Sequence, residues 1–251
     1  MEIFLVEAYI FVIILGLLLG SFISAFSWRY HAKLNWWSDR SRCTFCNHIL
    51  SWYDLFPLFS YLFLKGKCHY CNKHISIRYP FMELSVLASF LFLTLKFPII
   101  SSQFATYALL SFLLVLLSWY DISFREVIDV IAIPLIVILI ILNIANLTTL
   151  ILSLAVFILF CLIVIFTNGM GGGDIRIAVI ASLVLGFPNF IVGFEIAVFL
   201  AVIYGVSSSF KKHKSIKDIK KTQVPMIPFF TIGILIALVY GDIIVKKFLN
   251  L

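Results

Sequence analysis

The amino-acid sequence predicts an all-α polytopic membrane protein of about eight transmembrane helices, with a small four-cysteine insertion after the first helix. Of the 251 residues, 63% are hydrophobic and only 12% are charged, and the mean hydropathy is +1.11. A soluble core could not bury that much apolar surface, so we expect the solvent to be lipid. Apolar stretches also recur at lengths near the ~20 residues that a helix needs to cross a bilayer.

Eight apolar stretches are candidate spans, and the sixth of them is the shortest. They cover residues 4–26, 80–97, 102–119, 130–145, 148–167, 175–187, 190–209 and 226–245. The first stretch begins with the acidic residues Glu2 and Glu7, where a secretory signal peptide would carry basic residues. We therefore expect it to be retained as a membrane helix.

The distribution of basic residues predicts the orientation in the membrane. Many of them follow the first span directly, so by the positive-inside rule residues 27–79 are cytoplasmic and the N-terminus lies outside. This topology places all of the nineteen basic residues on the cytoplasmic side except Lys96, Lys246 and Lys247. The net charge of +7 then reflects orientation and contact with anionic lipid, and no nucleic-acid binding is expected.

Three parts are expected along the chain. Residues 1–26 form the first transmembrane helix, residues 27–79 a cytoplasmic insertion, and residues 80–251 a transmembrane helical bundle. The insertion is far longer than the usual helix connection of about 2–8 residues. A domain this small needs a stabilising cross-link because it cannot build a large core.

The cysteines of the insertion provide a candidate cross-link. Cys43 and Cys46 form one CxxC pair, and Cys68 and Cys71 form another. This spacing is typical of a structural zinc ion held by four thiolates. The alternative is two disulfides or four unconnected thiols, but disulfides do not persist in a reducing cytoplasm. The nearby histidines at positions 48, 69 and 74 are expected to be surface residues, since four cysteines already complete a closed site.

An apolar, aromatic-rich stretch, residues 52–64, lies between the two CxxC pairs, with Trp36 and Trp37 upstream. Such a stretch suits the headgroup layer of a membrane. It could equally form the core of the small insertion. Both interpretations remain open at the level of the sequence.

Two aspartates are the candidate catalytic residues. Asp121 lies at the inner end of the third span, and Asp174 follows three glycines at the inner start of the sixth. The predicted topology puts both at one face of the membrane, where a bundle could bring them together. Two carboxyls in a poorly hydrated pocket cannot both ionise easily, so they would share a proton. One could then activate a water while the other protonates a scissile amide.

The glycines before Asp174 are expected to contribute access. Without Cβ atoms, Gly169 and residues 171–173 could adopt positive φ and allow a substrate strand to approach. Structural alternatives exist for both aspartates. Asp121 could belong to an ion-pair ladder with Arg125 and Asp129 on one helix, and Asp174 could be an N-cap after a tight turn.

These residues resemble the bacterial prepilin peptidases, or type IV leader peptidases, a family of membrane aspartic proteases with a Gly-x-Gly-Asp signature. The resemblance covers nearly the whole chain. Its landmarks are Gly20-Ser21-Phe22, Arg42-Cys43-x-x-Cys46, Ser51-Trp52-Tyr53-Asp54, Pro57-Leu58-x-Ser60-Tyr61, Gly66-Lys67-Cys68-x-x-Cys71, Ile75-Ser76-x-Arg78-Tyr79-Pro80, Glu83, Asp121, Gly171-x-Gly173-Asp174 and Pro225 to Gly233.

The resemblance implies that Asp121 and Asp174 are the catalytic pair of an endopeptidase in the bacterial cytoplasmic membrane. Its substrates would be prepilin or pseudopilin precursors, cut at the cytoplasmic face. Many family members also N-methylate the new N-terminus with S-adenosylmethionine, but no residue here places a site for that cofactor. The compact length is similar to that of members from Gram-positive competence systems. Two departures concern positioning: Ile128 replaces a usual proline before Asp129, and Arg176 replaces a usual lysine.

Two other function classes compete with this interpretation. In a cation- or proton-coupled transporter, the same aspartates would bind the ion or relay protons, which favours positions near the middle of the membrane. A non-catalytic membrane anchor built on the zinc domain would have no use for the glycine-flanked aspartate.

Overall fold

A computed structural model of the chain describes residues 2–35, 40–167, 171–211 and 224–249. In these residues the fold is all-helical, with nine α-helices, one short 3-10 helix and two isolated β-bridges. The predicted all-α class is confirmed. The chain divides into two compact units, Met1–Trp119 and Tyr120–Leu251, which are described separately.

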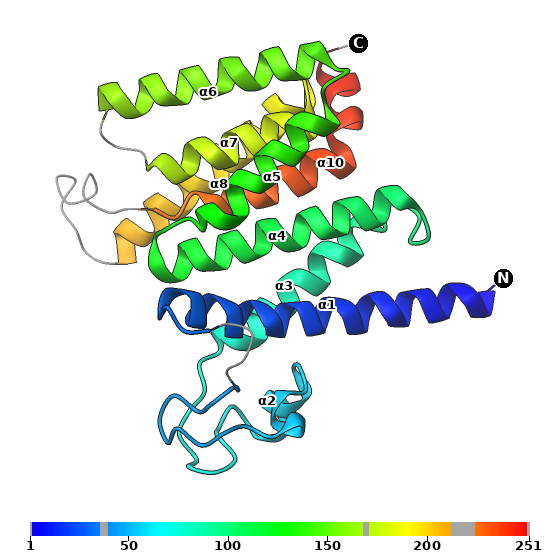
Figure 1. Ribbon diagram of the computed structural model, residues 1–251. Coiled ribbons are helices and arrows are strands. Elements are labelled where there is room, and N and C mark those ends of the chain that lie inside the picture. The colour runs from blue at the N-terminus through cyan, green and yellow to red at the C-terminus, as the bar shows by residue number, and fades with distance from the viewer. Residues whose placement is uncertain (1, 36–39, 168–170, 212–223, 250–251) are drawn as a thin grey trace. The chain divides into compact units, whose positions relative to one another are not determined.

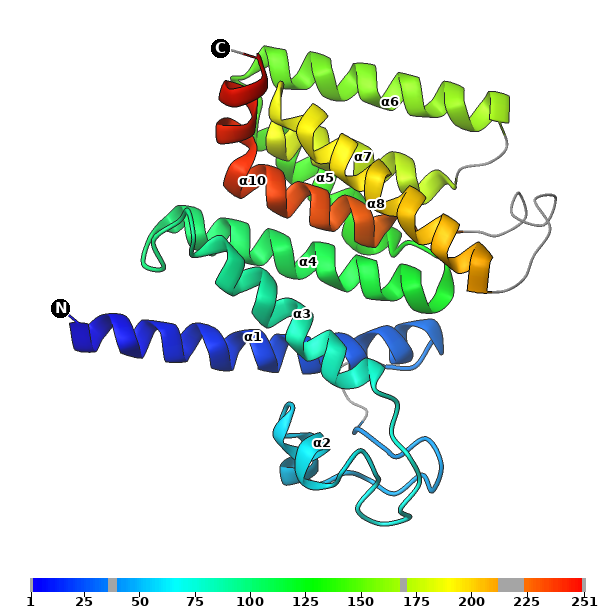
Figure 2. The same ribbon diagram turned by 180° about the vertical axis from the view of Figure 1, so that it is seen from behind.

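The first unit contains two helices packed against each other, the insertion that separates them in the sequence, and most of a further helix. Its elements are α1 (Glu2–His31), η1 (Trp52–Leu55), α2 (Phe59–Phe63), α3 (Arg78–Leu93) and most of α4 (Ser102–Phe124). Helices α1 and α3 are in close contact, as Figures 1 and 2 show. Gly20 makes this approach possible, because a Cβ atom there would overlap the backbone of Glu83. Small residues at helix contacts are the usual means of close packing in lipid.

The second unit is built around α7. Its other elements are α5 (Asp129–Leu142), α6 (Leu147–Thr167), α8 (Asn189–Lys211) and α10 (Ile227–Leu249), and α7 itself covers Gly172–Leu185. Residues 177–183 of α7 are all buried, because α5, α6, α8 and α10 pack around this helix. Helices α8 and α10 cross where Gly193 meets Gly233, and a Cβ atom on Gly233 would overlap the carbonyl of Gly193.

Each of the eight expected spans corresponds to a helix. Among the described helices, five are long and apolar enough to cross a membrane: α1, α4, α6, α8 and α10. Helices α3, α5 and α7 have 16, 14 and 14 residues, fewer than the ~20 of a full perpendicular span. The chain is therefore a multi-pass membrane protein, and the number eight stays a prediction.

A buried glutamate joins the insertion to the helices of the first unit. Glu83, on α3, is only 8% exposed, and its Oε2 accepts a hydrogen bond of 2.7 Å from the N–H of Leu58. The hydroxyl of Ser21 on α1 lies near this carboxyl. Leu58 has φ +61°, a left-handed conformation that costs an L-residue energy. The glutamate therefore stabilises a strained turn of the insertion and fixes its position beside α1 and α3.

Replacing Glu83 should loosen the insertion in proportion to the hydrogen bond that is lost. Glu83→Ala leaves the Leu58 N–H without its acceptor, which costs about 1–3 kcal/mol, whereas Glu83→Gln keeps a carbonyl oxygen in place. We expect a lower unfolding temperature in detergent for Glu83→Ala, with faster proteolysis between residues 52 and 65, and near wild-type behaviour for Glu83→Gln. Glu195→Ala, at an exposed glutamate of α8, is the control. Equal stability of the alanine variant and wild type would contradict this role of Glu83.

Candidate active site and metal centre

Asp121 lies in the last turn of α4 and belongs to the second unit. Its side chain is buried, with 8% exposure. The Oδ2 atom accepts a hydrogen bond of 3.4 Å from the N–H of Ile227, the first residue of α10. The N–H groups in the first turn of a helix have no partner within the helix and carry partial positive charge, which favours a carboxylate there. The start of α10 therefore holds the Asp121 carboxyl in place.

Asp174 lies in the first turn of α7 and is half-buried. Its Oδ2 accepts a hydrogen bond of 3.2 Å from the N–H of Gly171, and its own N–H donates to the Gly171 carbonyl at 3.1 Å. Gly171 is the N-cap of the helix, so the alternative that Asp174 is itself the N-cap is wrong. Asp174 instead closes the first turn from the third helical position, as the acidic residue of a capping box does.

The two aspartates lie in the same unit. The negative charge of Asp121 acts electrostatically on the Asp174 carboxyl. In each of them, Oδ2 is the oxygen that accepts a backbone hydrogen bond. Among the described residues, the Oδ1 atoms of Asp121 and Asp174 have no hydrogen-bond partner. Each carboxyl is therefore held to the backbone through Oδ2, and its Oδ1 is available to a water or a substrate.

The expected ion-pair ladder of Asp121, Arg125 and Asp129 on one helix is wrong. Helix α4 ends at Phe124, and Arg125 has φ +60°, so the chain turns before α5 begins at Asp129. Asp129 pairs instead with Arg176 of α7, with 3.0 Å between Nη2 and Oδ2. Both side chains are partly exposed, so the pair adds little stability. It does join the starts of α5 and α7.

The glycines before Asp174 serve packing rather than unusual backbone angles. A Cβ atom on Gly173 would overlap the side chain of Val127, in the turn that follows Asp121. The absence of a side chain therefore lets the chain after one aspartate pack against the residue before the other. Of the expected positive φ angles, none occurs at residues 171–173. Gly171 and Gly172 are exposed, and a Cβ atom on either would meet no atom closer than 3.9 Å, which agrees with the expectation of access. Gly169 lies outside the described residues.

The four cysteines of the insertion form one cluster. Their Sγ atoms all lie within 4.8 Å of one another, and the Sγ atoms of Cys43 and Cys71 are 3.8 Å apart. Tetrahedral zinc with four sulfur ligands at ~2.3 Å requires sulfur atoms about 3.8 Å apart. None of the four forms a disulfide. The cluster therefore fits a tetrahedral metal ion.

The two CxxC pairs are held by matching knuckles. In the first knuckle, the N–H of Cys43 donates to the carbonyl of His48, and the N–H of Asn47 donates to the carbonyl of Cys43. In the second, the N–H of Cys68 donates to the carbonyl of Lys73, and the N–H of Asn72 donates to the carbonyl of Cys68. Both asparagines have φ +55°, a conformation that asparagine tolerates better than most residues. The repeated Cys-x-x-Cys-Asn pattern was a signal for these turns that the analysis of cysteine spacing missed.

The backbone of the first knuckle favours a thiolate. Burial by itself raises the pKa of Cys43, but the N–H groups of Cys46 and Phe45 donate toward its sulfur, and the net result is a pKa of about 7. The backbone nitrogen of Phe45 lies 3.5 Å from the Cys43 sulfur. A low pKa favours metal binding, because the thiolate is the form of cysteine that binds metal.

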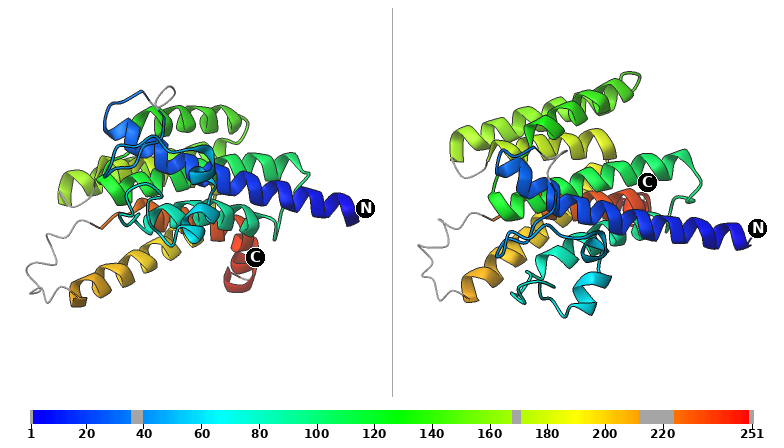
Figure 3. Two further views of the ribbon diagram at one scale, coloured as in Figure 1. Left: turned by 90° about the horizontal axis from the view of Figure 1, so that it is seen from below. Right: turned by 60° about the horizontal axis from the view of Figure 1, so that its bottom comes forward.

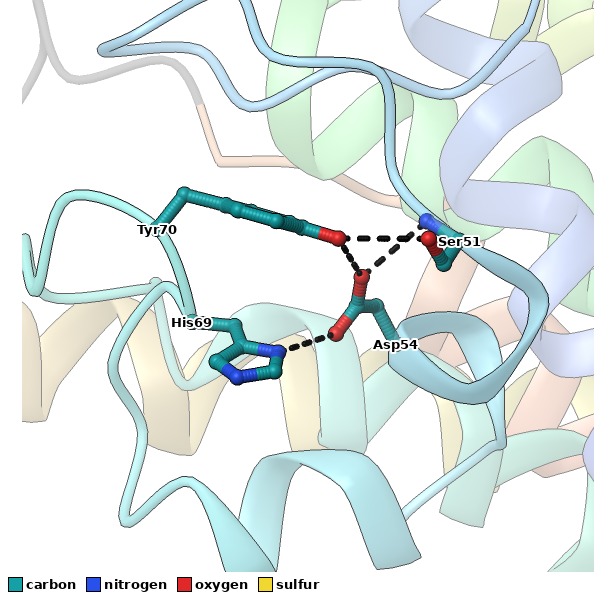
Figure 4. A network of polar contacts seen from close by, with 4 residues as sticks. All are labelled: Ser51, Asp54, His69 and Tyr70. Atoms are coloured by element: carbon teal, nitrogen blue, oxygen red, sulfur yellow. Dashed lines mark hydrogen bonds and ion pairs between the residues drawn. The ribbon is translucent and has the colours of Figure 1, made fainter.

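The histidines of the insertion are exposed and lie outside the cysteine cluster, as expected, yet two of them have partners. His69 lies 3.3 Å from Oδ1 of Asp54, and His48 stacks on Tyr70 with 3.7 Å between ring centroids. Asp54 also accepts hydrogen bonds from the N–H of Ser51 and the hydroxyl of Tyr70 (Figure 4). This buried carboxylate joins the second knuckle to η1, a role that the spacing of motifs did not reveal.

The two halves of the chain match two known sequence families. Residues 14–97, which include the cysteine cluster and Glu83, match the bacterial peptidase A24 N-terminal domain. Residues 108–206, which include both aspartates, match the type IV leader peptidase family. No solved structure matches the chain.

Curated relatives extend this match over almost the entire length. A protein of Bacillus subtilis (strain 168) named prepilin leader peptidase/N-methyltransferase is 30% identical over 95% of this chain and 96% of its own. Proteins with the same name are 35% identical over 46% of this chain and 47% of their own in Vibrio cholerae, and 27% identical over 87% of this chain and 77% of their own in Aeromonas salmonicida. These matches give the transporter interpretation no support. With the resemblance extending from the first helix through both aspartates, the chain belongs to the type IV leader peptidase family.

Proposed function

We propose that the protein is a membrane-embedded aspartic endopeptidase that removes the leader peptide from type IV prepilin or pseudopilin precursors. The names of its relatives support the substrate class. Aspartic-protease chemistry is supported by the pair of carboxyls in the second unit. Each of them accepts a hydrogen bond from a backbone N–H through one oxygen. Two carboxyls and a water are sufficient for peptide hydrolysis without a covalent intermediate.

In the proposed reaction, one carboxylate of the pair takes a proton from a water while the water oxygen bonds to the scissile carbonyl carbon. The other carboxyl, in its acid form, hydrogen-bonds to the carbonyl oxygen. When the carbon–nitrogen bond breaks, the departing amine receives a proton and the pair returns to its starting protonation state. The backbone donors at Gly171 and Ile227 keep both carboxyls oriented throughout, because they bind the oxygens that take no part in proton transfer.

Cleavage is proposed to occur at the cytoplasmic face. This side is supported by the basic residues that the predicted topology groups there, which include Arg125 and Arg176 next to the two aspartates. A prepilin whose basic leader stays in the cytoplasm would present its scissile bond at that level.

The zinc ion proposed for the four cysteines would be structural. Cys43, Cys46, Cys68 and Cys71 would hold it, and it would stabilise the insertion.

Removing either carboxylate should abolish cleavage without unfolding the protein. Asp121→Asn and Asp174→Asn keep an oxygen that can accept the same backbone hydrogen bond but cannot exchange a proton at neutral pH. We expect each to slow processing of a purified pilin-like precursor by about 10²–10⁴-fold, measured by mass spectrometry of the product in lipid. Asp129→Asn is the matched control, because Asp129 is exposed and lies in the same region. Undiminished cleavage by a folded Asp174→Asn variant would exclude the proposed pair.

A second activity, N-methylation of the new N-terminus, is supported by the names of the relatives, prepilin leader peptidase/N-methyltransferase. S-adenosylmethionine would supply the methyl group. With this compound present, the cleaved product should gain the mass of one methyl group, detected in the same mass spectra. A product that is cut but never methylated would restrict this protein to the peptidase activity.

The metal proposal predicts that the purified protein contains about one zinc ion per chain. Cys68→Ser should remove the metal and lower the unfolding temperature, because the insertion has little core of its own. The matched control is Cys161→Ser, at a half-buried cysteine of α6 outside the cluster. Atomic emission measurements of the three proteins give the comparison. An unchanged metal content in Cys68→Ser would contradict the proposed ligand set.

A further inference from the structure

The insertion exposes several apolar side chains between its two knuckles. We define the aromatic ridge as five residues of η1, α2 and the turn between them: Trp52, Phe56, Phe59, Leu62 and Phe63. Trp52 is 76% exposed, Leu62 69% and Phe63 83%. Of the two alternatives that the sequence left open, a core role is therefore excluded for these five side chains. Exposed apolar groups gathered in this way mark a surface that contacts lipid or another protein.

Two contacts within the first unit set the level of the ridge along α1. The backbone of Glu83 lies against Gly20 of α1, and the carboxyl of Glu83 binds the N–H of Leu58, which lies between Phe56 and Phe59. Gly20 is eleven residues before the end of α1 at His31. At 1.5 Å per residue, this is about 16 Å along the helix.

That level lies inside the candidate membrane span Phe4–His31, before the last turn, which carries the basic residues Arg29 and His31. Figures 1 and 2 show the same relation: α2 lies level with the C-terminal half of α1 and not beyond its end. In Figure 3, α2 is again displaced from the loops of the insertion toward the N-terminus of α1. The ridge therefore reaches back along the membrane helices, while the loops that carry the cysteines lie closer to the end of α1.

The backbone of this segment suits an environment without water. The N–H of Ser60 donates to the carbonyl of Phe56, and the N–H of Leu62 donates to that of Leu58, both at 3.0 Å. The N–H of Leu58, at the turn before α2, is satisfied by Glu83. In hydrocarbon an unpaired backbone group costs several kcal/mol, which gives a physical reason for placing a buried glutamate at this point.

The edges of the ridge match the chemistry of a membrane surface. Lys65 and Lys67 follow α2 directly and are exposed, where they can interact with anionic headgroups. Phe56, Phe59 and Phe63 also line an open, mostly apolar hollow of about 410 Å³, whose lining includes the polar residues Asp54, Ser60 and His69. Its apolar side offers room for part of an acyl chain. Apolar side chains next to lysines are the usual composition of segments that lie in the interface plane.

We propose that the aromatic ridge is embedded in the membrane leaflet at the C-terminal end of α1, with its side chains among lipid acyl chains and Lys65 and Lys67 at the headgroups. In this arrangement the insertion is anchored in the membrane, and Glu83 fixes its depth. It is not a freely moving soluble domain. This role is independent of the peptidase chemistry, because it needs neither Asp121 nor Asp174.

A photoreactive probe tests which molecule covers the ridge. Benzoylphenylalanine replaces Phe63 in the full chain, which is reconstituted in vesicles of phosphatidylethanolamine and phosphatidylglycerol, illuminated and analysed by mass spectrometry. The matched control carries the same probe at Phe45, which is 63% exposed but lies in the first knuckle. We expect a phospholipid adduct at position 63 in several-fold higher yield than at position 45. A probe at Phe59 should behave as at position 63.

Every other outcome overturns the proposal. Equal lipid yields at positions 63 and 45 would mean that the ridge is no closer to lipid than the knuckle. A cross-linked dimer at position 63 would identify a second copy of the chain as the occupant. An adduct to an added prepilin in place of lipid would identify the substrate helix. Because Phe63 is exposed, the bulkier probe should not disturb folding, and retained zinc content would verify this in each variant.

Discussion

Lipid offers no hydrogen bonds, and the polar groups of this chain are arranged around that constraint. Three carboxylates lie at or near points where a helix begins, ends or meets a turn, and each accepts a hydrogen bond from a backbone N–H. Glu83 binds Leu58, Asp121 binds Ile227 and Asp174 binds Gly171. In each pair an N–H outside regular helical bonding is satisfied by a side chain that would itself be costly to leave unpaired.

The same arrangement explains how two aspartates can be held firmly and still be available for chemistry. A carboxylate has two oxygens, and the structure uses one of each for anchoring. The turn after Asp121 packs through Val127 against Gly173, which immediately precedes Asp174. Larger residues at position 173 would separate these segments. Packing of this kind positions the pair more firmly than a flexible glycine loop could, and residues 171–173 adopt no positive φ.

The insertion meets the problem of small size in two ways. A four-cysteine cluster joins its two knuckles, and Glu83 joins its central turn to the membrane helices. Between these attachments the insertion directs its aromatic side chains outward instead of inward. A domain that cannot bury its apolar residues in its own core can place them in lipid, provided that its backbone is paired and its depth is fixed. The short helix α2 pairs part of this backbone, and Glu83 pairs the N–H of Leu58 and fixes the depth.

The sequence by itself determined the features that depend on local pattern. Apolar runs predict the eight helices because a span must be long and apolar wherever it lies in the bundle. The CxxC spacing predicts the cysteine cluster because a knuckle is built from adjacent residues. The aspartates could be selected as candidates from their positions beside apolar runs and glycines. Only the tertiary structure decided which oxygen of each aspartate is anchored, that α4 stops before Asp129, and that the five side chains of the aromatic ridge face outward. These properties depend on partners that are distant in sequence, such as Leu58 with Glu83 and Ile227 with Asp121. A local sequence pattern carries no information about which distant backbone N–H will hydrogen-bond to a given carboxylate.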